Sequence, residues 1–279
     1  MTSGRALVEQ LASVWESIGA LGDALDEEEW NTPTECPGWS VQDNVTHLFG
    51  IEAMLAGRPT PKAVTETAAA AMEGAAGGVH DKGGIGALNE AWVDAWRARS
   101  GAETLAEFRA ITGERLAQLR PLDDDGFETP SWTPMGPGTI ATLLPFRIFD
   151  SWVHEQDMRR ALGRPGDVTG AAADNCYAQL VGFVPYVVGK KVGAPTGTTL
   201  VLEISGAANR SIGVEVDGRA RLTDPVPEPT ARLSMDTDTF VRLMNGRGDV
   251  DEIMASGAVH LSGDQALGRA FVDQANVLF

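Results

Sequence analysis

The fold of the first half of the chain follows from residues 139–163, which read TIATLLPFRIFDSWVHEQDMRRALG. Thr139 stands at a predicted N-cap, because a threonine hydroxyl accepts a backbone N–H from the first turn of a helix. Leu162 is followed by Gly163 and then by Pro165, the order in which helices commonly end. We therefore predict a long helix from Thr139 to Leu162, with a kink at Pro145.

Three other amphipathic segments precede this helix. Apolar residues recur at steps of three and four over residues 7–25, 41–55 and 87–119, and this periodicity predicts helices. Ser40 is the predicted N-cap of the second segment, and the third is predicted to break near Ser100. Four long amphipathic helices predict a four-helix bundle.

Long connections are predicted between these helices, because the intervening residues are rich in glycine, proline and small or acidic side chains. They are residues 26–40, 60–86 and 121–138.

The second half of the chain has a different pattern, in which apolar residues alternate with polar ones. We predict a bridging helix over residues 171–184 and a small sheet with interleaved helices. The predicted strands are residues 198–204, 212–216, 231–235 and 258–261, and the predicted helices are residues 237–245 and 264–275. The expected fold class is a two-domain protein, with a helical bundle over residues 1–165 and a small α+β domain over residues 166–279.

The composition excludes several classes of partner. The formal net charge is −17, and no concentrated basic face is evident, so nucleic acid and anionic membranes are not expected as partners. No stretch has the length of a membrane span and no apolar leader opens the chain, so we expect a cytoplasmic protein. Cys36 and Cys176 are too few for a disulfide framework. The sequence does not indicate an oligomeric state.

The candidate metal ligands lie on two of the predicted helices. Asp150 and His154 are four residues apart and share one helix face, which Asp157 continues. Such a pair is also typical of a solvated ion pair, and His47, near the middle of the second helix, is equally compatible with a core histidine. Their common setting in a bundle favours a shared site, because facing helices pool ligands in a bundle core.

Two imidazoles and one carboxylate leave coordination positions open, as in catalytic metal sites. The set suits Zn²⁺, and Fe²⁺ and Ni²⁺ accept similar ligands.

Residues 35–48, ECPGWSVQDNVTHL, and residues 146–163, FRIFDSWVHEQDMRRALG, resemble the mycothiol-dependent maleylpyruvate isomerase family. The resemblance covers nearly the whole chain. It implies an N-terminal bundle of the DinB type and a C-terminal sterol-carrier-like domain, here from Val214 to the end with a turn at residues 261–264.

The resemblance also implies a divalent metal, usually taken as zinc, bound by His47, Asp150 and His154, and mycothiol as cosubstrate. The founding isomerase has glutamate at the position of Asp150, so the carboxylate arm of this chain is one methylene shorter.

This resemblance and the open ligand set lead to one main functional hypothesis. The metal would hold a low-molecular-weight thiol as thiolate, which adds to a small electrophilic substrate as an isomerase or as an S-transferase. Metal-assisted hydrolysis is an alternative, with bound water as the nucleophile. A non-enzymatic alternative is an apolar-ligand-binding protein whose metal site is structural or vestigial.

Other side chains have weaker claims on the site. Trp39, Trp132 and Trp152 either line a pocket over the metal, where Trp39 and Trp152 would contact the cosubstrate, or pack in the core. Asp157 either orients a ligand or pairs with Arg159 or Arg160. Cys36 is interpreted as an incidental thiol. His80 and His260 are interpreted as surface or packing residues.

The second domain contributes arginines as candidate groups for a substrate carboxylate. Arg210 and Arg232 are the predicted catalytic residues, and Arg221 is a third candidate, if that domain closes over the bundle. Solvated surface charge is the alternative for each of them.

Overall fold

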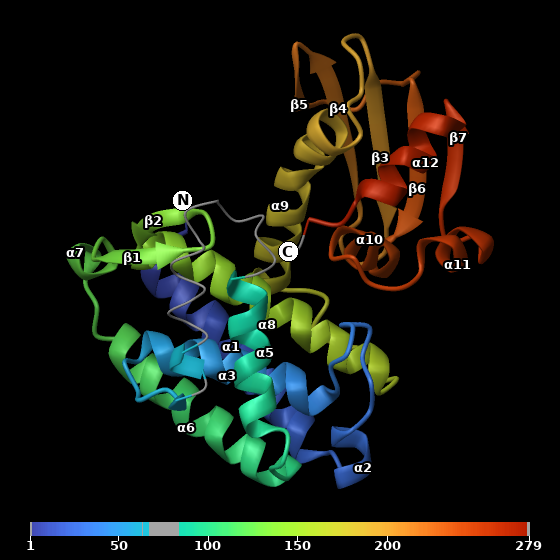
Figure 1. Cartoon of the computed structure of the whole chain (residues 1–279). Coiled ribbons are helices and arrows are strands. Elements are labelled where there is room, and N and C mark those ends of the chain that lie inside the picture. The colour runs from blue at the N-terminus through green and yellow to red at the C-terminus, as the bar shows by residue number, and fades with distance from the viewer. Residues whose placement is uncertain (1, 63, 67–83, 278–279) are drawn as a thin grey trace. The chain divides into compact units, whose positions relative to one another are not determined.

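The computed structural model describes residues 2–62, 64–66 and 84–277. The chain divides into two compact units between Asp167 and Val168 (Figure 1). The long connection predicted over residues 60–86 lies mostly outside the described residues, and His80 lies outside them altogether.

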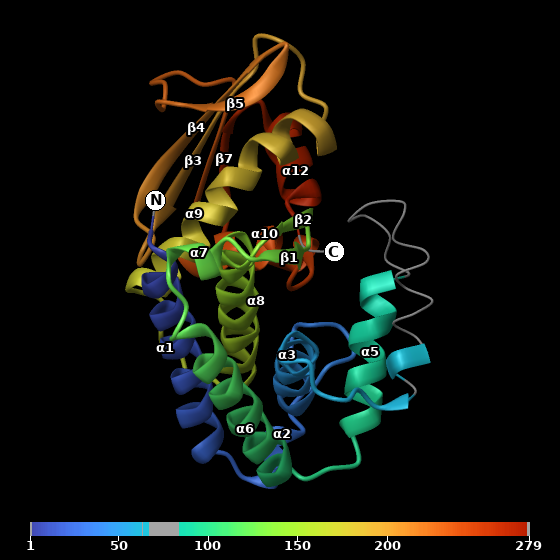
Figure 2. The ribbon, with the colours of Figure 1, turned by 90° about the vertical axis from the view of Figure 1, so that its left-hand side faces the viewer.

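The first unit contains the four long helices that the periodicity predicts (Figure 2). They are α1 (Gly4–Asp23), α3 (Val41–Leu55), α6 (Gly101–Leu119) and α8 (Ile140–Ala161), and α5 (Gly84–Trp96) packs beside α3. The third predicted segment is broken where expected, because Ser100 caps α6 and forms a capping box with Glu103.

Local hydrogen bonds explain where these helices begin and end. The Ser40 hydroxyl accepts from the backbone N–H of Asp43, whose carboxylate accepts from the backbone N–H of Ser40. Thr139 and Thr142 form the same arrangement at the start of α8. Gly163 follows α8 with φ of +62°, a conformation that glycine adopts without a steric penalty. The predicted caps are therefore confirmed.

Helix α8 is deeply buried over residues 147–158. From Arg147 to Met158 every residue except Asp150 is buried, and α1 and α3 pack against it. The buried residues include charged and polar side chains, which must find partners inside the protein. The helix continues through Pro145.

The connections of the first unit contain more structure than predicted. Residues 121–138 hold α7 (Asp124–Phe127) and a hairpin of β1 (Pro130–Thr133) and β2 (Gly136–Thr139), so the prediction of a loop is wrong there. Four-residue strands that contain proline and glycine lack the alternation that predicts strands. Residues 26–40 contain the short helix α2 (Glu27–Trp30), which Asp26 and Glu29 cap.

The second unit is a five-stranded sheet with helices, in the strand order β5-β4-β3-β6-β7. Strands β3 and β6 are parallel and the other pairs are antiparallel. The elements are α9 (Ala171–Tyr186), a π-helical turn η2 (Val187–Lys191), β3 (Thr199–Ser205), β4 (Arg210–Asp217), β5 (Arg219–Thr223), β6 (Ala231–Asp236), α10 (Thr237–Met244), α11 (Val250–Ala255), β7 (His260–Gly263) and α12 (Gln265–Gln274). Helix α9 packs against β4 and β5, and α12 packs against β6 and β7.

The bridging helix, four strands and two later helices of this unit are confirmed at or near the predicted positions. The sequence does not predict β5, because this five-residue edge strand is largely exposed and Ala220 and Leu222 are its two apolar residues. It also misses α11, which is only six residues long. Within the described residues, none of the helices combines the length and the apolar character that crossing a membrane requires.

Candidate metal centre

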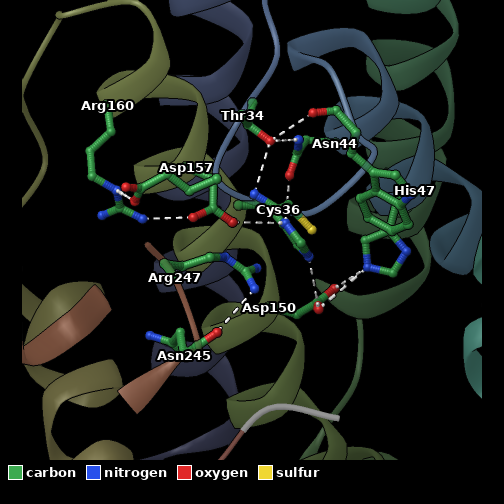
Figure 3. A network of polar contacts seen from close by, with 12 residues as sticks. Thr34, Cys36, Asn44, His47, Asp150, Asp157, Arg160, Asn245 and Arg247 are labelled. Atoms are coloured by element: carbon green, nitrogen blue, oxygen red, sulfur yellow. Dashed lines mark hydrogen bonds and ion pairs between the residues drawn. The ribbon is translucent and has the colours of Figure 1, made fainter. Parts of the chain in front are cut away.

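The structure brings His47, Asp150 and His154 together inside the first unit. His47 projects from α3 and Asp150 from α8 (Figure 3). His154 lies one turn after Asp150 on α8. His47 Nε2 lies 3.3 Å from Asp150 Oδ2 and 3.4 Å from Oδ1, and His154 Nε2 lies 3.7 Å from Asp150 Oδ1. One ligand atom from each of the three side chains lies within 4.8 Å of the other two.

These separations fit a bound divalent ion. Zinc bonds of about 2.0–2.1 Å at tetrahedral angles place two ligand atoms about 3.3–3.4 Å apart. The observed separations of 3.3–3.7 Å between the carboxylate and the two imidazoles are close to that value and longer than a typical hydrogen bond of about 2.9 Å. The donor set and its spacing are therefore compatible with a metal centre.

The electrostatic setting favours the protonation states that a metal needs. Burial lowers the pKa of His47, so its imidazole is neutral at neutral pH. Burial alone would raise the pKa of Asp150, but the facing His47 ring and the guanidinium of Arg147 outweigh it and hold that pKa well below its usual range. A neutral imidazole and an ionised carboxylate thus face each other.

A buried ion network anchors the carboxylate of Asp150. Arg147 Nη1 donates to Asp150 Oδ2 at 2.8 Å, and Arg147 Nε donates to Glu52 Oε1 at 2.7 Å. The other oxygen of Glu52 accepts from Arg115 Nε at 3.0 Å. We did not predict this network from the sequence, although Glu52 follows Leu48 by four residues on the apolar face of α3, where a charged residue needs a partner.

His154 has two further polar neighbours at its other ring nitrogen. Its Nδ1 lies 2.6 Å from Asn44 Oδ1 and 3.4 Å from Asp157 Oδ2. The predicted pairing of Asp157 with Arg160 is confirmed, because its Oδ1 accepts from Arg160 at 2.6 Å (Figure 3). Its role in orienting a metal ligand stays a prediction. Arg159 instead pairs with Glu155.

The three tryptophans singled out in the sequence have different positions. The half-buried ring of Trp39 lies 5.0 Å from the ring of His47 and 5.7 Å from that of His154, measured between centroids. Trp152 is 1% exposed, and its indole donates to the backbone carbonyl of Asp167 at 2.8 Å, as a core residue would. Trp132 is 54% exposed on β1. Only Trp39, among these three, is brought to the histidines.

Cys36, interpreted from the sequence as an incidental thiol, lies near His154. Its sulfur, a ring nitrogen of His154 and a carboxylate oxygen of Asp157 lie within 4.8 Å of one another. The thiol is half-buried. This second group shares His154 with the first one.

The predicted catalytic arginines lie in the second unit and have partners there. Arg232 pairs with Glu203 and donates to two backbone carbonyls. Arg210 donates to the carbonyl of Ala208 at 2.8 Å, and its guanidinium lies 5.7 Å from the centre of the Tyr177 ring. Their role in substrate binding stays a prediction.

The two remaining candidates of the second unit are also placed. Arg221 pairs with Glu215 and Asp217, and His260 is exposed on β7.

Comparison with known protein families accounts for both units. The family model described as the mycothiol maleylpyruvate isomerase N-terminal domain matches residues 11–159. This chain belongs to the mycothiol-dependent maleylpyruvate isomerase family. The C-terminal domain of the same family matches residues 178–270. The resemblance seen in residues 35–48 and 146–163 is thereby confirmed.

Solved structures of the family show the same fold. The crystal structure of the mycothiol-dependent maleylpyruvate isomerase aligns with 94% of this chain and 93% of its own, with a TM-score of 0.55 and 13% sequence identity. A mutant of that enzyme aligns equally well, at 14% identity. Sterol carrier protein 2 from Yarrowia lipolytica aligns with 37% of the chain, with a TM-score of 0.28 and 12% identity. The predicted fold class, a helical N-terminal region followed by an α/β sheet region, is confirmed.

Two relatives come from Mycobacterium tuberculosis. They are the uncharacterised proteins Rv0036c of strain H37Rv and MT0041 of strain CDC 1551, each 28% identical to this chain over 157 residues. The match covers 56% of this chain and 56% of each relative.

Proposed function

We propose that this protein is a mycothiol-dependent metalloenzyme that acts on a small electrophilic molecule, as an isomerase or as a thiol S-transferase. Its metal ligands would be His47, Asp150 and His154. The observation that carries the proposal is the spacing of 3.3–3.7 Å between the Asp150 carboxylate and the two imidazoles. Membership of a family named for mycothiol supports the choice of cosubstrate.

The shorter side chain of Asp150 still reaches the centre of the site. Its Oδ2 accepts from Arg147 and lies 3.3 Å from His47 Nε2. Its Oδ1 lies 3.4 Å from His47 Nε2 and 3.7 Å from His154 Nε2, so this oxygen is near both histidines. The pairing with Arg147 restricts rotation of the carboxylate and keeps Oδ1 in this orientation.

The chain supplies a ligand set with positions left open for a substrate. A divalent ion held there would lower the pKa of a coordinating thiol and so supply thiolate at neutral pH. The ring of Trp39 packs against both imidazoles and shields one side of them from water. Water exclusion strengthens the electrostatic interactions in such a site.

The two proposed reactions differ in the fate of one carbon–sulfur bond. In isomerisation the thiol sulfur adds to one carbon of an activated double bond, the resulting single bond rotates, and the sulfur leaves with its electron pair, so the thiol is returned unchanged. In S-transfer the carbon–sulfur bond persists: after addition to a double bond the neighbouring carbon takes up a proton from solvent, and in a substitution the leaving group departs to solvent with its electron pair. Maleylpyruvate, the substrate named for the family, is the first molecule to test.

The test begins with elemental analysis of the purified protein, of His154→Ala and of the control His260→Ala, whose side chain is exposed on β7. We expect one divalent ion per chain in the wild type and in the control, and loss of the ion in His154→Ala. Calorimetric titration of metal-loaded protein with mycothiol should then show binding that the metal-free protein lacks.

Two results would contradict the proposal. A wild-type protein that takes up no ion after reconstitution refutes the metal centre. A metal-loaded protein that turns over substrate equally well without thiol points to metal-assisted hydrolysis instead.

A further inference from the structure

The contact between His154 Nδ1 and Asn44 Oδ1, at 2.6 Å, is not explained by metal ligation alone. A neutral imidazole carries its proton on one ring nitrogen and a lone pair on the other. Only the tautomer with the proton on Nδ1 leaves a lone pair on Nε2, the nitrogen that faces Asp150. The residue that bonds to Nδ1 therefore determines whether His154 can serve as a ligand through Nε2.

The orientation of the Asn44 amide follows from its other partners. Asn44 Nδ2 lies 2.8 Å from the backbone carbonyl of Ser40 and 3.1 Å from Thr34 Oγ1. A carbonyl oxygen only accepts hydrogen bonds, so the amide NH₂ group must face Ser40. Asn44 is completely buried, so solvent does not compete for these contacts. Its Oδ1 consequently faces His154 and accepts from Nδ1.

Thr34 makes the reverse orientation of the amide still less favourable. The Thr34 hydroxyl donates its hydrogen to the carbonyl of Trp39 at 2.9 Å. Its oxygen accepts from the backbone N–H of Cys36 at 3.2 Å and from Asn44 Nδ2 (Figure 3). The donor and both lone pairs of this hydroxyl are thus assigned. The backbone carbonyls of Ser40 and Trp39 can only accept hydrogen bonds. They therefore fix the donor and the acceptor of each hydrogen bond that leads through Thr34 and Asn44 to His154.

The second neighbour of His154 Nδ1 also favours a proton on this nitrogen. Asp157 Oδ2 lies 3.4 Å from Nδ1, and the carboxylate pairs with Arg160 through Oδ1. Asn44 Oδ1 and the Asp157 carboxylate are both acceptors, and the Cys36 sulfur also lies within 4.8 Å of a ring nitrogen of His154. His47 provides a contrast, because its Nδ1 is buried and has no hydrogen-bond partner within the part of the chain that the structure describes.

We propose that Asn44, held by Ser40 and Thr34, is a positioning residue that fixes His154 as the Nδ1–H tautomer and presents Nε2 to the metal. The role toward a metal rests on the proposed function. The tautomer itself is a property of the metal-free protein and is measurable without any ion. Hydrogen-bond partners of ligating histidines commonly contribute about 10- to 100-fold to metal affinity.

The experiment uses nitrogen-15 labelling of the histidine rings and long-range proton–nitrogen correlation spectra of the metal-free protein, recorded over a series of pH values. The signals of His154 are assigned by their loss in His154→Ala. We expect a protonated Nδ1 and an unprotonated Nε2 in the wild type. Asn44→Leu, which removes the acceptor at similar size, should give a mixture of tautomers.

Two further variants separate this role from a loss of folding. Thr34→Val removes one of the two acceptors that orient the amide, so it should shift the tautomer mixture less than Asn44→Leu does. Gln42→Leu is the matched control, because Gln42 is a buried amide on the same helix that donates to the carbonyl of Arg99. It should leave the His154 spectrum unchanged.

Metal titration completes the test. The dissociation constant for zinc should rise about 10- to 100-fold in Asn44→Leu and stay at the wild-type value in Gln42→Leu. A protonated Nε2 in the wild type, or a tautomer unchanged in both Asn44→Leu and Thr34→Val, overturns the inference. If the tautomer responds as expected but no protein binds metal, the proposed function fails and the tautomer assignment stands.

Discussion

Replacing Arg147 with methionine should lower the free energy of unfolding of the metal-free protein by about 3 kcal/mol. Arg147 is buried and joins two carboxylates, through Nε to Glu52 and through Nη1 to Asp150. Removing one member of a buried ion pair costs about 3–5 kcal/mol, because a charge is left in a medium of low polarity. The lower end applies here, since Arg115 continues to neutralise Glu52.

The assay is urea unfolding in the presence of a chelator, for the wild type, Arg147→Met, Glu52→Gln and the double variant. Glu52→Gln removes the charge that Arg147 compensates, so the double variant should be less destabilised than the sum of the single ones. The control is Arg58→Met, because Arg58 pairs with Glu114 in a half-exposed position and should contribute less than about 1 kcal/mol. Equal losses for Arg147→Met and Arg58→Met, or strictly additive losses, would refute the assignment of a buried network.

Three other predictions follow from the positions of side chains near the candidate centre. Cys36→Ser should leave the metal stoichiometry unchanged, whereas Asp150→Ala should abolish metal binding. A loss of metal in the cysteine variant would assign the ion to the group of Cys36, His154 and Asp157. Trp152→Phe should lower the free energy of unfolding by about 0.5–1.5 kcal/mol, because it removes the hydrogen bond that the buried indole donates to the carbonyl of Asp167. A weakened affinity for mycothiol at unchanged stability would contradict a core role. Trp39→Ala should weaken mycothiol binding, as measured by calorimetry, while Trp39→Phe should retain most of the affinity. Equal affinities of the wild type and Trp39→Ala for mycothiol would exclude a contact with this ring.

The helices of the bundle could be predicted because their signals are local. The Ser40 and Thr139 caps, the glycine after α8 and the repeat of apolar residues lie within each segment. The spacing of Asp150 and His154 is likewise a property of one helix. These signals place two candidate ligands on one face without any knowledge of tertiary contacts.

The surroundings of the ligands could not be predicted in the same way, because they depend on side chains far apart in the sequence. Glu52 and Arg147 are 95 positions apart, and Asn44 and His154 are 110 positions apart. Asn44 gives no periodic signal of its own, and a buried asparagine on a helix is recognised only when its partners are known. The same holds for Trp39, whose contact with the two histidines depends on the conformation of the loop before α3.

X-ray absorption spectroscopy of the zinc-loaded protein would identify the ligands of the ion. We expect two imidazole nitrogens and carboxylate oxygen at about 2.0–2.2 Å, with no sulfur, and a new zinc–sulfur distance of about 2.3 Å when mycothiol is added. A sulfur ligand before thiol addition would indicate Cys36 and contradict the ligand set. A spectrum without imidazole would contradict the metal centre of His47, Asp150 and His154 altogether.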